Sequence, residues 1–407
     1  MKQFTIPNIY RSRLISGVKE KRKAADKLKK DFTPTLLNLG PLQIYLARHF
    51  GFCYGVENAI EIAFNTISNN PDKNIYLLSE MIHNPRVNAD LQERGVRFLQ
   101  DTYGKQIIPF ETLTADDVVI IPAFGTTLEI EELLRSKGIA VEKYNTTCPF
   151  VEKVWNRSEQ IAQKGYSIVV HGKPKHEETR ATFSHASANT PTVVVNDMAE
   201  TIELAKYMTG QKPAANFYTE FKGRYSEGFD ISKDLQRIGV VNQTTQLATD
   251  TQAISDYLKE VIRNHYQLNE SNIGERFADT RDTLCYATND NQTAVTGMLN
   301  TPADIAIVIG GHNSSNSSHL VELCEAKRTT YFIDHPDKLI SKDHILHCNW
   351  KTKEFSEISN YLPAGSPVKI LITSGASCPD AIVEQVIRKL ASFYNAEDRV
   401  DAFIETL

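Results

Sequence analysis

The chain has 407 residues, of which 41% are hydrophobic and 23% charged, a composition typical of a soluble globular protein with room for two or three domains. Its longest apolar runs, such as Ile305–Ile309, fall far short of the roughly 18 residues that a membrane-spanning helix needs, so we expect no membrane contact. The net charge of −5 gives no reason to expect nucleic acid as a partner.

The N-terminal segment, residues 1–40, is basic. Within residues 1–37, ten Lys and Arg residues stand against three acids, and the cluster is densest at Lys19–Lys30. Organelle transit peptides are rich in Ser and poor in acids, unlike this segment, which also lacks the continuous apolar stretch of a secretory signal. We therefore expect a surface helix or extension here.

From Pro41 onward, short apolar runs alternate with amphipathic helical stretches, which predicts α/β units around mostly parallel sheets. Helices with one apolar face are indicated at 151–162 and 382–390. Nine runs are predicted as strands: Ile44–Ala47, Ile75–Leu78, Val118–Ile121, Ile168–Val170, Val193–Val195, Ile238–Val241, Ile305–Ile309, Tyr331–Ile333 and Ile370–Ile372.

Three cysteines, Cys53, Cys148 and Cys285, each stand directly before a predicted helix. Around Cys53, in RHFGFCYGVENAI, Gly51 and Gly55 allow tight turns, and the N-terminus of the helix that follows stabilises a thiolate. A lone cysteine of this kind is more often a small buried apolar residue. Three of them suit an iron–sulfur cluster, which is a net anion held by thiolates, and we take such a cluster as our hypothesis.

The other cysteines, Cys324, Cys348 and Cys378, are predicted to be structural or incidental. Cys324 falls within a predicted helix, and a fourth ligand at Cys378 would close a site that an enzyme must keep open. The six cysteines include no CxxC pair and do not form the pattern of a secreted disulfide framework, so we expect a cytoplasmic protein.

Polar segments follow several predicted strands, at the strand ends where open α/β sheets bind ligands. The segment Gly310–His319 offers Ser314, Ser315 and Asn316 together with backbone amides, which suits phosphate oxygens at a helix start. The segment Ser374–Ser377 has the same character. The alternative interpretation of each segment is an ordinary Ser/Asn/Gly turn with no ligand. A Walker-type GxxxxGK[ST] motif is missing, so we expect no nucleoside triphosphate.

Histidine and carboxylate residues add candidates for acid–base chemistry. His176 and Glu178 lie two residues apart, where the imidazole can contact an anion while the carboxylic acid delivers a proton; the alternative is a solvated surface pair. His83 and Thr244 are weaker candidates on their own, and Thr244 is otherwise a helix cap.

Eight motifs, taken together and in order, resemble the 4-hydroxy-3-methylbut-2-enyl diphosphate reductase family, the last enzymes of the methylerythritol phosphate route to isoprenoids. The match runs from about Ile44 to Leu390. The motifs are GFCYGV, IHNP, TTCP, HEE-x-x-AT, NQTT, CYAT-x-x-x-Q, NSSNS and SGAS-x-PD.

The resemblance implies a trefoil of three similar α/β domains around a [4Fe–4S] cluster with three cysteine ligands and one open iron. The implied reaction removes the allylic hydroxyl of the substrate as water, using two electrons and protons, and yields isopentenyl and dimethylallyl diphosphate. By motif, the implied ligands are Cys53, Cys148 and Cys285, the proton source is Glu178, and Thr244 lies near the hydroxyl. The implied diphosphate contacts are His83, His176, Ser314, Ser315, Asn316 and Ser377.

Two departures from the family pattern stand out. Phe124 occupies a position where many shorter bacterial members have a histidine, so one contact is missing or replaced. The basic start and an insertion near 208–236 resemble the longer plant- and cyanobacterium-like branch, for which the implied electron donor is a protein such as ferredoxin or flavodoxin.

The predicted domain division follows the three cysteines. After a basic extension at 1–40, we expect a first α/β domain at 41–148 and a second at 149–284 that carries the insertion. Residues 285–407 complete a third α/β domain and the C-terminal tail.

Other functions are compatible with three cysteines. A hydro-lyase of the aconitase type also combines three cysteine ligands with one open iron, but it consumes no electrons. A non-catalytic redox sensor would bind a cluster without needing the polar loops. A structural Cys₃ zinc site is disfavoured because the spacings of 95 and 137 residues are unlike those of zinc knuckles or ribbons.

Overall fold

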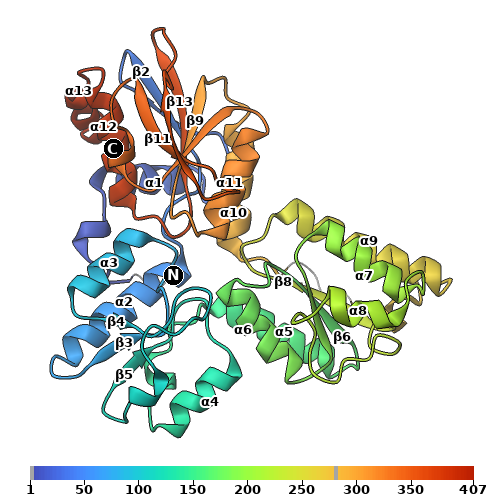
Figure 1. The fold of residues 1–407 in the computed structure, drawn as a ribbon. Coiled ribbons are helices and arrows are strands. Elements are labelled where there is room, and N and C mark those ends of the chain that lie inside the picture. Colours follow the sequence, from blue (N-terminus) through green and yellow to red (C-terminus); the bar gives the residue numbers. More distant parts are fainter. Residues whose placement is uncertain (1–3, 279–282) are drawn as a thin grey trace. The chain divides into compact units, whose positions relative to one another are not determined.

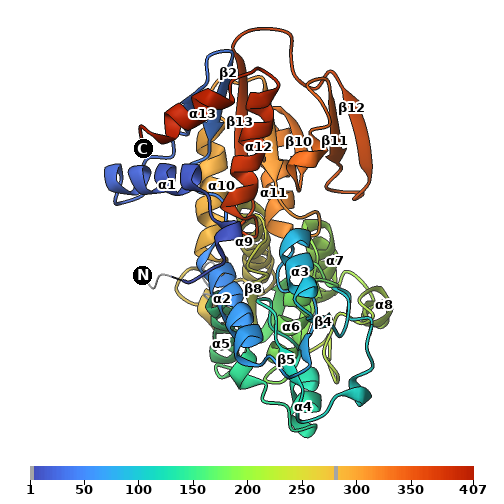
Figure 2. The same ribbon diagram turned by 90° about the vertical axis from the view of Figure 1, so that its left-hand side faces the viewer.

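The computed structural model describes residues 4–278 and 283–407, so Asp282, at the edge of the predicted Cys285 loop, lies outside the described part. The chain divides into two compact units, drawn in Figures 1 and 2. The first comprises Met1–Glu61, Ile82–Asp90 and Tyr286–Leu407; the second comprises Ile62–Met81 and Leu91–Cys285. Helices α2 (Tyr54–Asn69) and α3 (Pro85–Glu93) each contain residues of both.

The first unit is built on a five-stranded sheet of order β1-β2-β13-β9-β10, in which only the β1–β2 pair is antiparallel. The strand β9 reads IAIVI and is buried along its whole length, as expected for a parallel strand covered on both faces. The strands are β1 (Thr35–Asn38), β2 (Leu42–Leu46), β9 (Ile305–Ile309), β10 (Thr329–Ile333) and β13 (Val368–Ser374).

Helices cover both faces of this sheet. In Figures 1 and 2, α1, α12 and α13 lie on one side and α10 and α11 on the other. A two-stranded antiparallel hairpin follows β10. The bounds are α1 (Arg13–Ala25), α10 (Tyr286–Met298), α11 (Ser315–Glu325), α12 (Asp380–Ser392), α13 (Glu397–Ile404), β11 (His344–Cys348) and β12 (Phe355–Ser359).

The N-terminal segment forms a helix, α1, as expected, and one face of this helix is part of the first unit's core. Helix α1 is capped by Ser12, whose side chain accepts a hydrogen bond from the amide of Ile15. Leu14, Ile15 and Val18 are buried with the sheet residues, while Arg13, Lys21 and Lys23 are exposed. The strand β1 then pairs with β2, so residues 35–38 belong to the sheet.

The second unit contains two three-stranded parallel sheets, of order β4-β3-β5 and β7-β6-β8. The strands are β3 (Ile75–Leu77), β4 (Arg97–Phe98), β5 (Val118–Ile120), β6 (Ser167–His171), β7 (Thr192–Val195) and β8 (Ile238–Asn242). The helices are α4 (Leu128–Ser136), α5 (Pro149–Ala162), α6 (Glu177–Ser187), α7 (Met198–Met208), α8 (Ala214–Glu220) and α9 (Ala248–His265).

The predicted fold class is confirmed: the chain is α/β, with three mostly parallel sheets, and all nine predicted strands are present within a few residues. The sheets do not follow one another as three consecutive blocks, because β2 pairs with β13 from the far end of the chain. The domain division at residues 148 and 284 stays a prediction. The five-stranded sheet joins strands of the predicted third domain to β2 of the predicted first domain and to β1 of the N-terminal segment.

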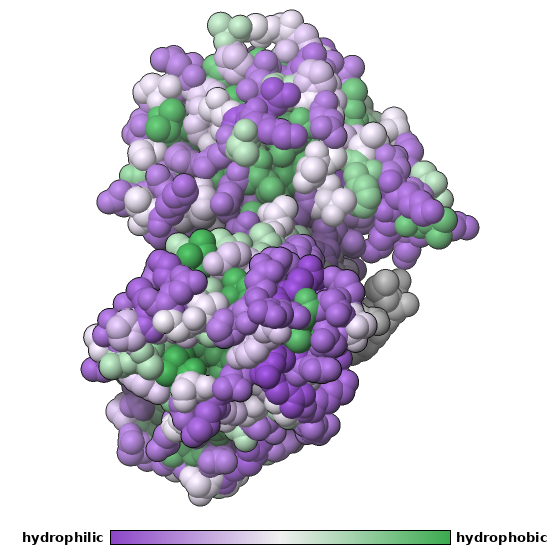
Figure 3. Space-filling view, turned by 90° about the vertical axis from the view of Figure 1, so that its right-hand side faces the viewer, coloured by the Kyte–Doolittle hydropathy of each residue, from purple (hydrophilic) through white to green (hydrophobic). Residues whose placement is uncertain are grey.

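The surface of the molecule is mixed. On the face drawn in Figure 3, hydrophilic side chains predominate and apolar ones form scattered groups. None of the helices in the described part of the chain has both the length and the apolar character that crossing a membrane requires.

The segment 208–236, which we expected to be an insertion or long loop, is anchored by aromatic packing. It contains α8, and Phe217 in that helix is completely buried. The Phe217 ring lies 5.0 Å from that of Phe221 and 5.5 Å from that of Phe229, between ring centroids. The apolar periodicity is weak because the anchoring residues come from α8 and from the turns after it.

Replacing Phe217 tests whether this segment is core. Phe217→Ala should lower the free energy of unfolding by about 3–5 kcal/mol, because it removes a buried ring and leaves a cavity. Urea unfolding followed by circular dichroism measures the change. Asn216→Ala, at an exposed position in the same helix, is the matched control and should stay within about 0.5 kcal/mol of the native chain. Equal stability of the two variants would mean that the segment is a loosely held loop.

Candidate functional site

Each of the three predicted ligand cysteines stands at the start of a helix, as the sequence indicated. Helix α2 begins at Tyr54, one residue after Cys53; Cys148 is the N-cap of α5; and α10 begins at Tyr286, one residue after Cys285. Of the two glycines around Cys53, only Gly51 adopts a positive φ, of 78°, while Gly55 lies within α2. The tight turn therefore precedes the cysteine.

Exposure separates the six cysteines into two groups of three. All six are free thiols. Cys53, Cys148 and Cys285 are half-buried at helix starts, whereas Cys324, Cys348 and Cys378 are completely buried in the first unit's core. Thiolates are the ligands that iron–sulfur clusters take, and a ligand must be reachable from outside the core. The first group has the donor chemistry and the exposure of a cluster ligand set.

The electrostatic surroundings of Cys148 do not suit a thiolate standing alone. The pKa of the Cys148 thiol is raised to about 12, chiefly by burial and also by the neighbouring Cys285 and Glu178, against opposing hydrogen bonds from the amides of Phe150 and Val151. An anion here needs a compensating positive group in addition to the helix N-terminus. Bound iron would provide that compensation, although within the described residues no three His, Cys, Asp or Glu side chains are gathered as a metal-binding group.

Glu178, Thr244 and Cys285 are linked by hydrogen bonds in the second unit. The amide of Thr244 donates to Oε1 of Glu178 at 2.5 Å, and the amide of Cys285 donates to the carbonyl of Thr244 at 3.2 Å. Glu178 and Thr244 are buried. Helix α9 begins at Ala248 after Leu247, so Thr244 is not its cap. The fold thus joins the candidate proton donor to the loop that carries a candidate ligand.

His176 lies at the N-terminal end of α6, beside Glu178. Its Nδ1 accepts a hydrogen bond from the amide of Glu178 at 3.2 Å, which makes it the helix cap. The ring of Phe124 meets the imidazole edge to face, at 5.7 Å between centroids. Phe124 therefore provides an aromatic packing surface for His176.

In the first unit, the loop between β13 and α12 contacts three of the predicted residues. The carbonyl of Ala376 accepts a hydrogen bond from the amide of Cys53 at 3.3 Å, and the amide of Ala376 donates to Oδ1 of Asn316 at 2.9 Å. The hydroxyl of Ser377 donates to the carbonyl of His83 at 3.2 Å. One short loop thereby joins a candidate cluster ligand to the candidate diphosphate residues.

The start of α11 carries polar atoms with no partner. Ser314 caps the helix, its hydroxyl accepting from the amide of Ser317 at 3.2 Å. The hydroxyls of Ser315 and Ser317 and Nδ2 of Asn316 are buried and make no hydrogen bond. Leaving a buried polar group unsatisfied costs about 1–3 kcal/mol. A bound anion at this helix N-terminus would satisfy these donors.

A close backbone approach completes this region. Gly311 lies against the carbonyl of His83, and a side chain at position 311 would overlap that oxygen. Neither Gly311 nor Ser317 was among the predicted site residues. The signal for Ser317 was present in the sequence: it follows the cap Ser314 by three residues, and this spacing places a residue on the same face of a helix.

The predicted residues therefore form two sets. Each set lies within one compact unit. Cys53, Ser314 and Ser377 follow β2, β9 and β13, and His176 and Thr244 follow β6 and β8, so these five lie beyond the carboxyl ends of strands, as expected for open α/β sheets. The first unit holds Cys53, His83, Ser314, Ser315, Asn316 and Ser377, and the second holds Cys148, His176, Glu178, Thr244 and Cys285.

Comparison with known sequences gives extensive matches. The 4-hydroxy-3-methylbut-2-enyl diphosphate reductase of Prochlorococcus marinus (strain MIT 9313) is 41% identical over 356 residues, which cover 87% of this chain and 86% of the relative. The protein of the same name from Picosynechococcus sp. is 40% identical over 355 residues, which cover 87% of this chain and 85% of the relative.

Solved structures with a similar fold carry related names. One is of (E)-4-hydroxy-3-methyl-but-2-enyl diphosphate reductase, the terminal enzyme of the non-mevalonate pathway; it has a TM-score of 0.52 at 26% identity and covers 86% of this chain and 99% of that one. The E-1-hydroxy-2-methyl-but-2-enyl-4-diphosphate reductase from Plasmodium falciparum has a TM-score of 0.61 at 22% identity, with coverages of 86% and 87%, a likeness of fold.

The family model described as LytB protein matches residues 44–391, nearly the range over which the eight motifs occur. Since this match covers most of the chain, and since relatives near 40% identity cover most of it as well, the chain belongs to the LytB protein family.

Proposed function

We propose that this chain reduces 4-hydroxy-3-methylbut-2-enyl diphosphate to isopentenyl and dimethylallyl diphosphate, the final step of the methylerythritol phosphate route. The relatives near 40% identity carry the name of this reductase, and the family is one of iron–sulfur enzymes. The observation that carries the proposal is the group of buried, unpartnered donors at the start of α11, because it calls for an anionic ligand.

The diphosphate end of the substrate binds at α11. Its oxygens accept hydrogen bonds from the hydroxyl of Ser315, from Nδ2 of Asn316 and from the amides of the helix N-terminus. Further contacts come from Ser314, Ser377, His83 and His176. Charge-assisted hydrogen bonds of this kind are roughly twice as strong as neutral ones. Two side-chain donors that are unsatisfied without ligand, on Ser315 and Asn316, thus become a source of binding energy.

Cys53, Cys148 and Cys285 are the proposed ligands of a [4Fe–4S] cluster with one open iron. When bound, the cluster supplies electrons and a Lewis acid for departure of the allylic hydroxyl. The contribution of the chain is to hold three thiolates at helix N-termini, where the aligned amides stabilise negative charge.

Glu178 is the proposed proton donor. Its Oε1 accepts a hydrogen bond from the amide of Thr244, which fixes the carboxyl group. We assign the transferred proton to Oε2. Glu178 is buried, which separates its carboxyl group from bulk water. Thr244 stands next to it and orients the substrate hydroxyl that leaves as water. Two electrons enter from a partner protein, a ferredoxin or flavodoxin, and we place the chain in the cytoplasm.

Removing the proton of Glu178 tests the assigned chemistry. Glu178→Gln should lower turnover about 100-fold or more, the usual cost of losing a general acid, while iron content and substrate affinity stay at native values. Anaerobic turnover with a chemical reductant measures the change. Glu159→Gln, an exposed carboxylate on α5, is the control and should turn over normally. Native turnover by the Glu178 variant would assign the proton to another group.

Ser315 tests the diphosphate site, because its hydroxyl has no partner in the free chain. Ser315→Ala should leave the free energy of unfolding unchanged or slightly raised, yet weaken binding of inorganic diphosphate about tenfold or more, since a hydrogen bond to a charged group contributes about 1.5–3 kcal/mol. Calorimetric titration and urea unfolding measure the two quantities.

The control for this variant is Ser158→Ala. The Ser158 hydroxyl is equally buried but donates to the carbonyl of Val154 at 3.0 Å. Its loss should reduce stability and leave diphosphate binding unchanged, the opposite pattern. Undiminished diphosphate binding by the Ser315 variant would remove the start of α11 from the substrate site.

A further inference from the structure

Residues 4–32 of the N-terminal segment contact the loop that carries Cys53. We call residues 48–54 the Cys53 loop. Five of its seven residues have a partner in residues 4–32, and the two stretches run in opposite directions, so that Tyr54 meets Phe4 and Arg48 meets Asp26. All of these residues belong to the first unit.

The end of the loop nearest α2 is covered by aromatic rings. The Phe4 ring lies 4.8 Å from that of Tyr54, and the Tyr10 ring lies 5.9 Å from that of Phe52, both in edge-to-face geometry. Phe4 is 6% exposed and Tyr10 is 2% exposed, so both rings are core residues in this position. Phe52 and Tyr54 are the immediate neighbours of Cys53. Two rings of the N-terminal segment thereby pack against the residues that flank Cys53 in the sequence.

The middle of the loop is held by Lys19 from α1. Its ammonium lies 5.0 Å from the centre of the Phe50 ring and 2.7 Å from Oδ1 of Asp380, the first residue of α12. Gly51 passes between them, and a side chain at Gly51 would overlap both charged groups. The turn before Cys53 is therefore enclosed by a charge pair that depends on α1.

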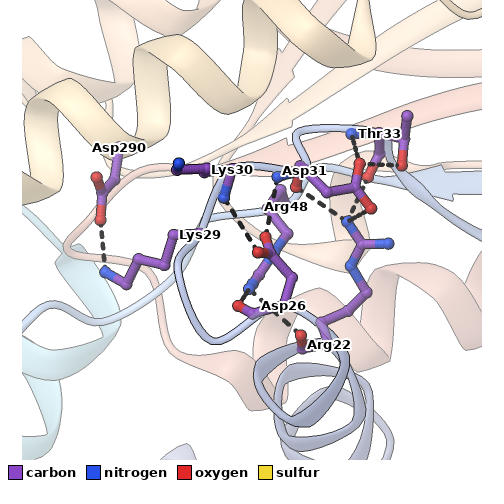
Figure 4. A network of polar contacts seen from close by, with 8 residues as sticks. All are labelled: Arg22, Asp26, Lys29, Lys30, Asp31, Thr33, Arg48 and Asp290. Carbon is purple, nitrogen blue, oxygen red and sulfur yellow. Dashed lines mark hydrogen bonds and ion pairs between the residues drawn. The ribbon is translucent and has the colours of Figure 1, made fainter.

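The start of the loop is tied to the end of α1, as Figure 4 shows. The guanidinium of Arg48 lies 3.9 Å from Oδ2 of Asp26, and Nη2 of Arg48 donates to the carbonyl of Asp26 at 3.4 Å. Arg48 is 7% exposed, and its burial lowers the pKa of the guanidinium. The His49 ring lies 6.1 Å from that of Phe32. A buried Arg is costly without partners, and this one takes them from the N-terminal segment.

The same segment reaches the start of α10. Nζ of Lys29 lies 2.8 Å from Oδ2 of Asp290 and 5.8 Å from the ring of Tyr286, the residue after Cys285. The hydroxyl of Tyr286 in turn accepts from the amide of Tyr54 at 3.0 Å. The N-terminal segment therefore supports residues that adjoin two of the three proposed ligands.

We infer that residues 4–32 are a positioning segment that fixes the Cys53 loop in the geometry of a cluster ligand and shields its thiol. The cluster itself rests on the proposed function; the bracing of the loop does not. Loops that carry function are mobile unless packed, and this loop is packed by a segment distant in sequence. Phe4 and Tyr10 act through Phe52 and Tyr54, so they are positioning residues.

The reactivity of the cysteine thiols tests the inference without any metal. In the iron-free full chain, the double variant F4A/Y10A should raise the rate of Cys53 alkylation by iodoacetamide about tenfold or more, because the loop opens locally once the two rings are gone. Peptide mapping by mass spectrometry reads each thiol separately. Cys148 and Cys285 are internal controls and should react at native rates. Tyr10→Phe keeps the ring, loses the hydroxyl bond to Asp90 and should behave as native.

Two outcomes would overturn the inference. An unchanged Cys53 rate would mean that the segment does not hold the loop, and an equal increase at all three cysteines would mean that the variant only loosens the whole fold. Phe217→Ala, which weakens the second unit's core, calibrates general destabilisation and should leave the rate at Cys53 unchanged.

The iron-loaded chain provides a second readout. F4A/Y10A should release iron to a chelator several-fold faster than the native chain, with an altered electron paramagnetic resonance signal, and Tyr10→Phe should do neither. Release at the native rate with a native signal would contradict the positioning role. If the native chain takes up no iron, the proposed function fails while the alkylation pattern still decides whether the segment braces the loop.

Discussion

The chain's proposed chemistry depends on holding thiolates where burial opposes them. Burial raises the pKa of Cys148 to about 12, and its neighbours Cys285 and Glu178 add negative charge. Amide groups at a helix N-terminus offset part of this cost, and the proposed metal cluster would offset the rest. A cysteine directly before a helix lies close to the amides of the helix N-terminus, which stabilise its thiolate. Cys53, Cys148 and Cys285 all have this position.

The same principle extends from sulfur to phosphate. At α11, Ser315, Asn316 and Ser317 hold buried donors that the folded chain itself does not satisfy. Folding alone would favour apolar residues at these positions, because each unsatisfied group is destabilising. Their presence is explained by a ligand that supplies the missing acceptors. The loop at Ala376 joins this region to Cys53, so the diphosphate residues and one proposed ligand are fixed by the same backbone.

Much of the fold was predictable because buried parallel strands consist of consecutive apolar residues. The run IAIVI of β9 could be recognised at sight, whereas β12, reading FSEIS, is mostly exposed and carries no such signal. Helix α1 was expected on the surface because its lysines dominate its composition, although Leu14, Ile15 and Val18 form a buried stripe. The aromatic anchoring of 208–236 depends on rings from separate turns, which periodicity cannot detect.

The placement of the candidate site residues was predictable where it depends on local sequence. A cysteine before a helix and a serine at a helix start both follow from neighbouring sequence. The bond from Thr244 to Glu178 joins residues 66 positions apart, and the contacts of the Cys53 loop with the N-terminal segment join two separate stretches of chain. Such contacts arise only when the strands are assembled.

The most direct test of the account is the iron and acid-labile sulfide content of the chain after purification without oxygen. The account predicts about four irons per chain with matching sulfide, lost in Cys53→Ala, Cys148→Ala and Cys285→Ala and retained in Cys324→Ala, Cys348→Ala and Cys378→Ala. Zinc in place of iron, no metal after anaerobic reconstitution, or a full iron complement in any of the first three variants would contradict it.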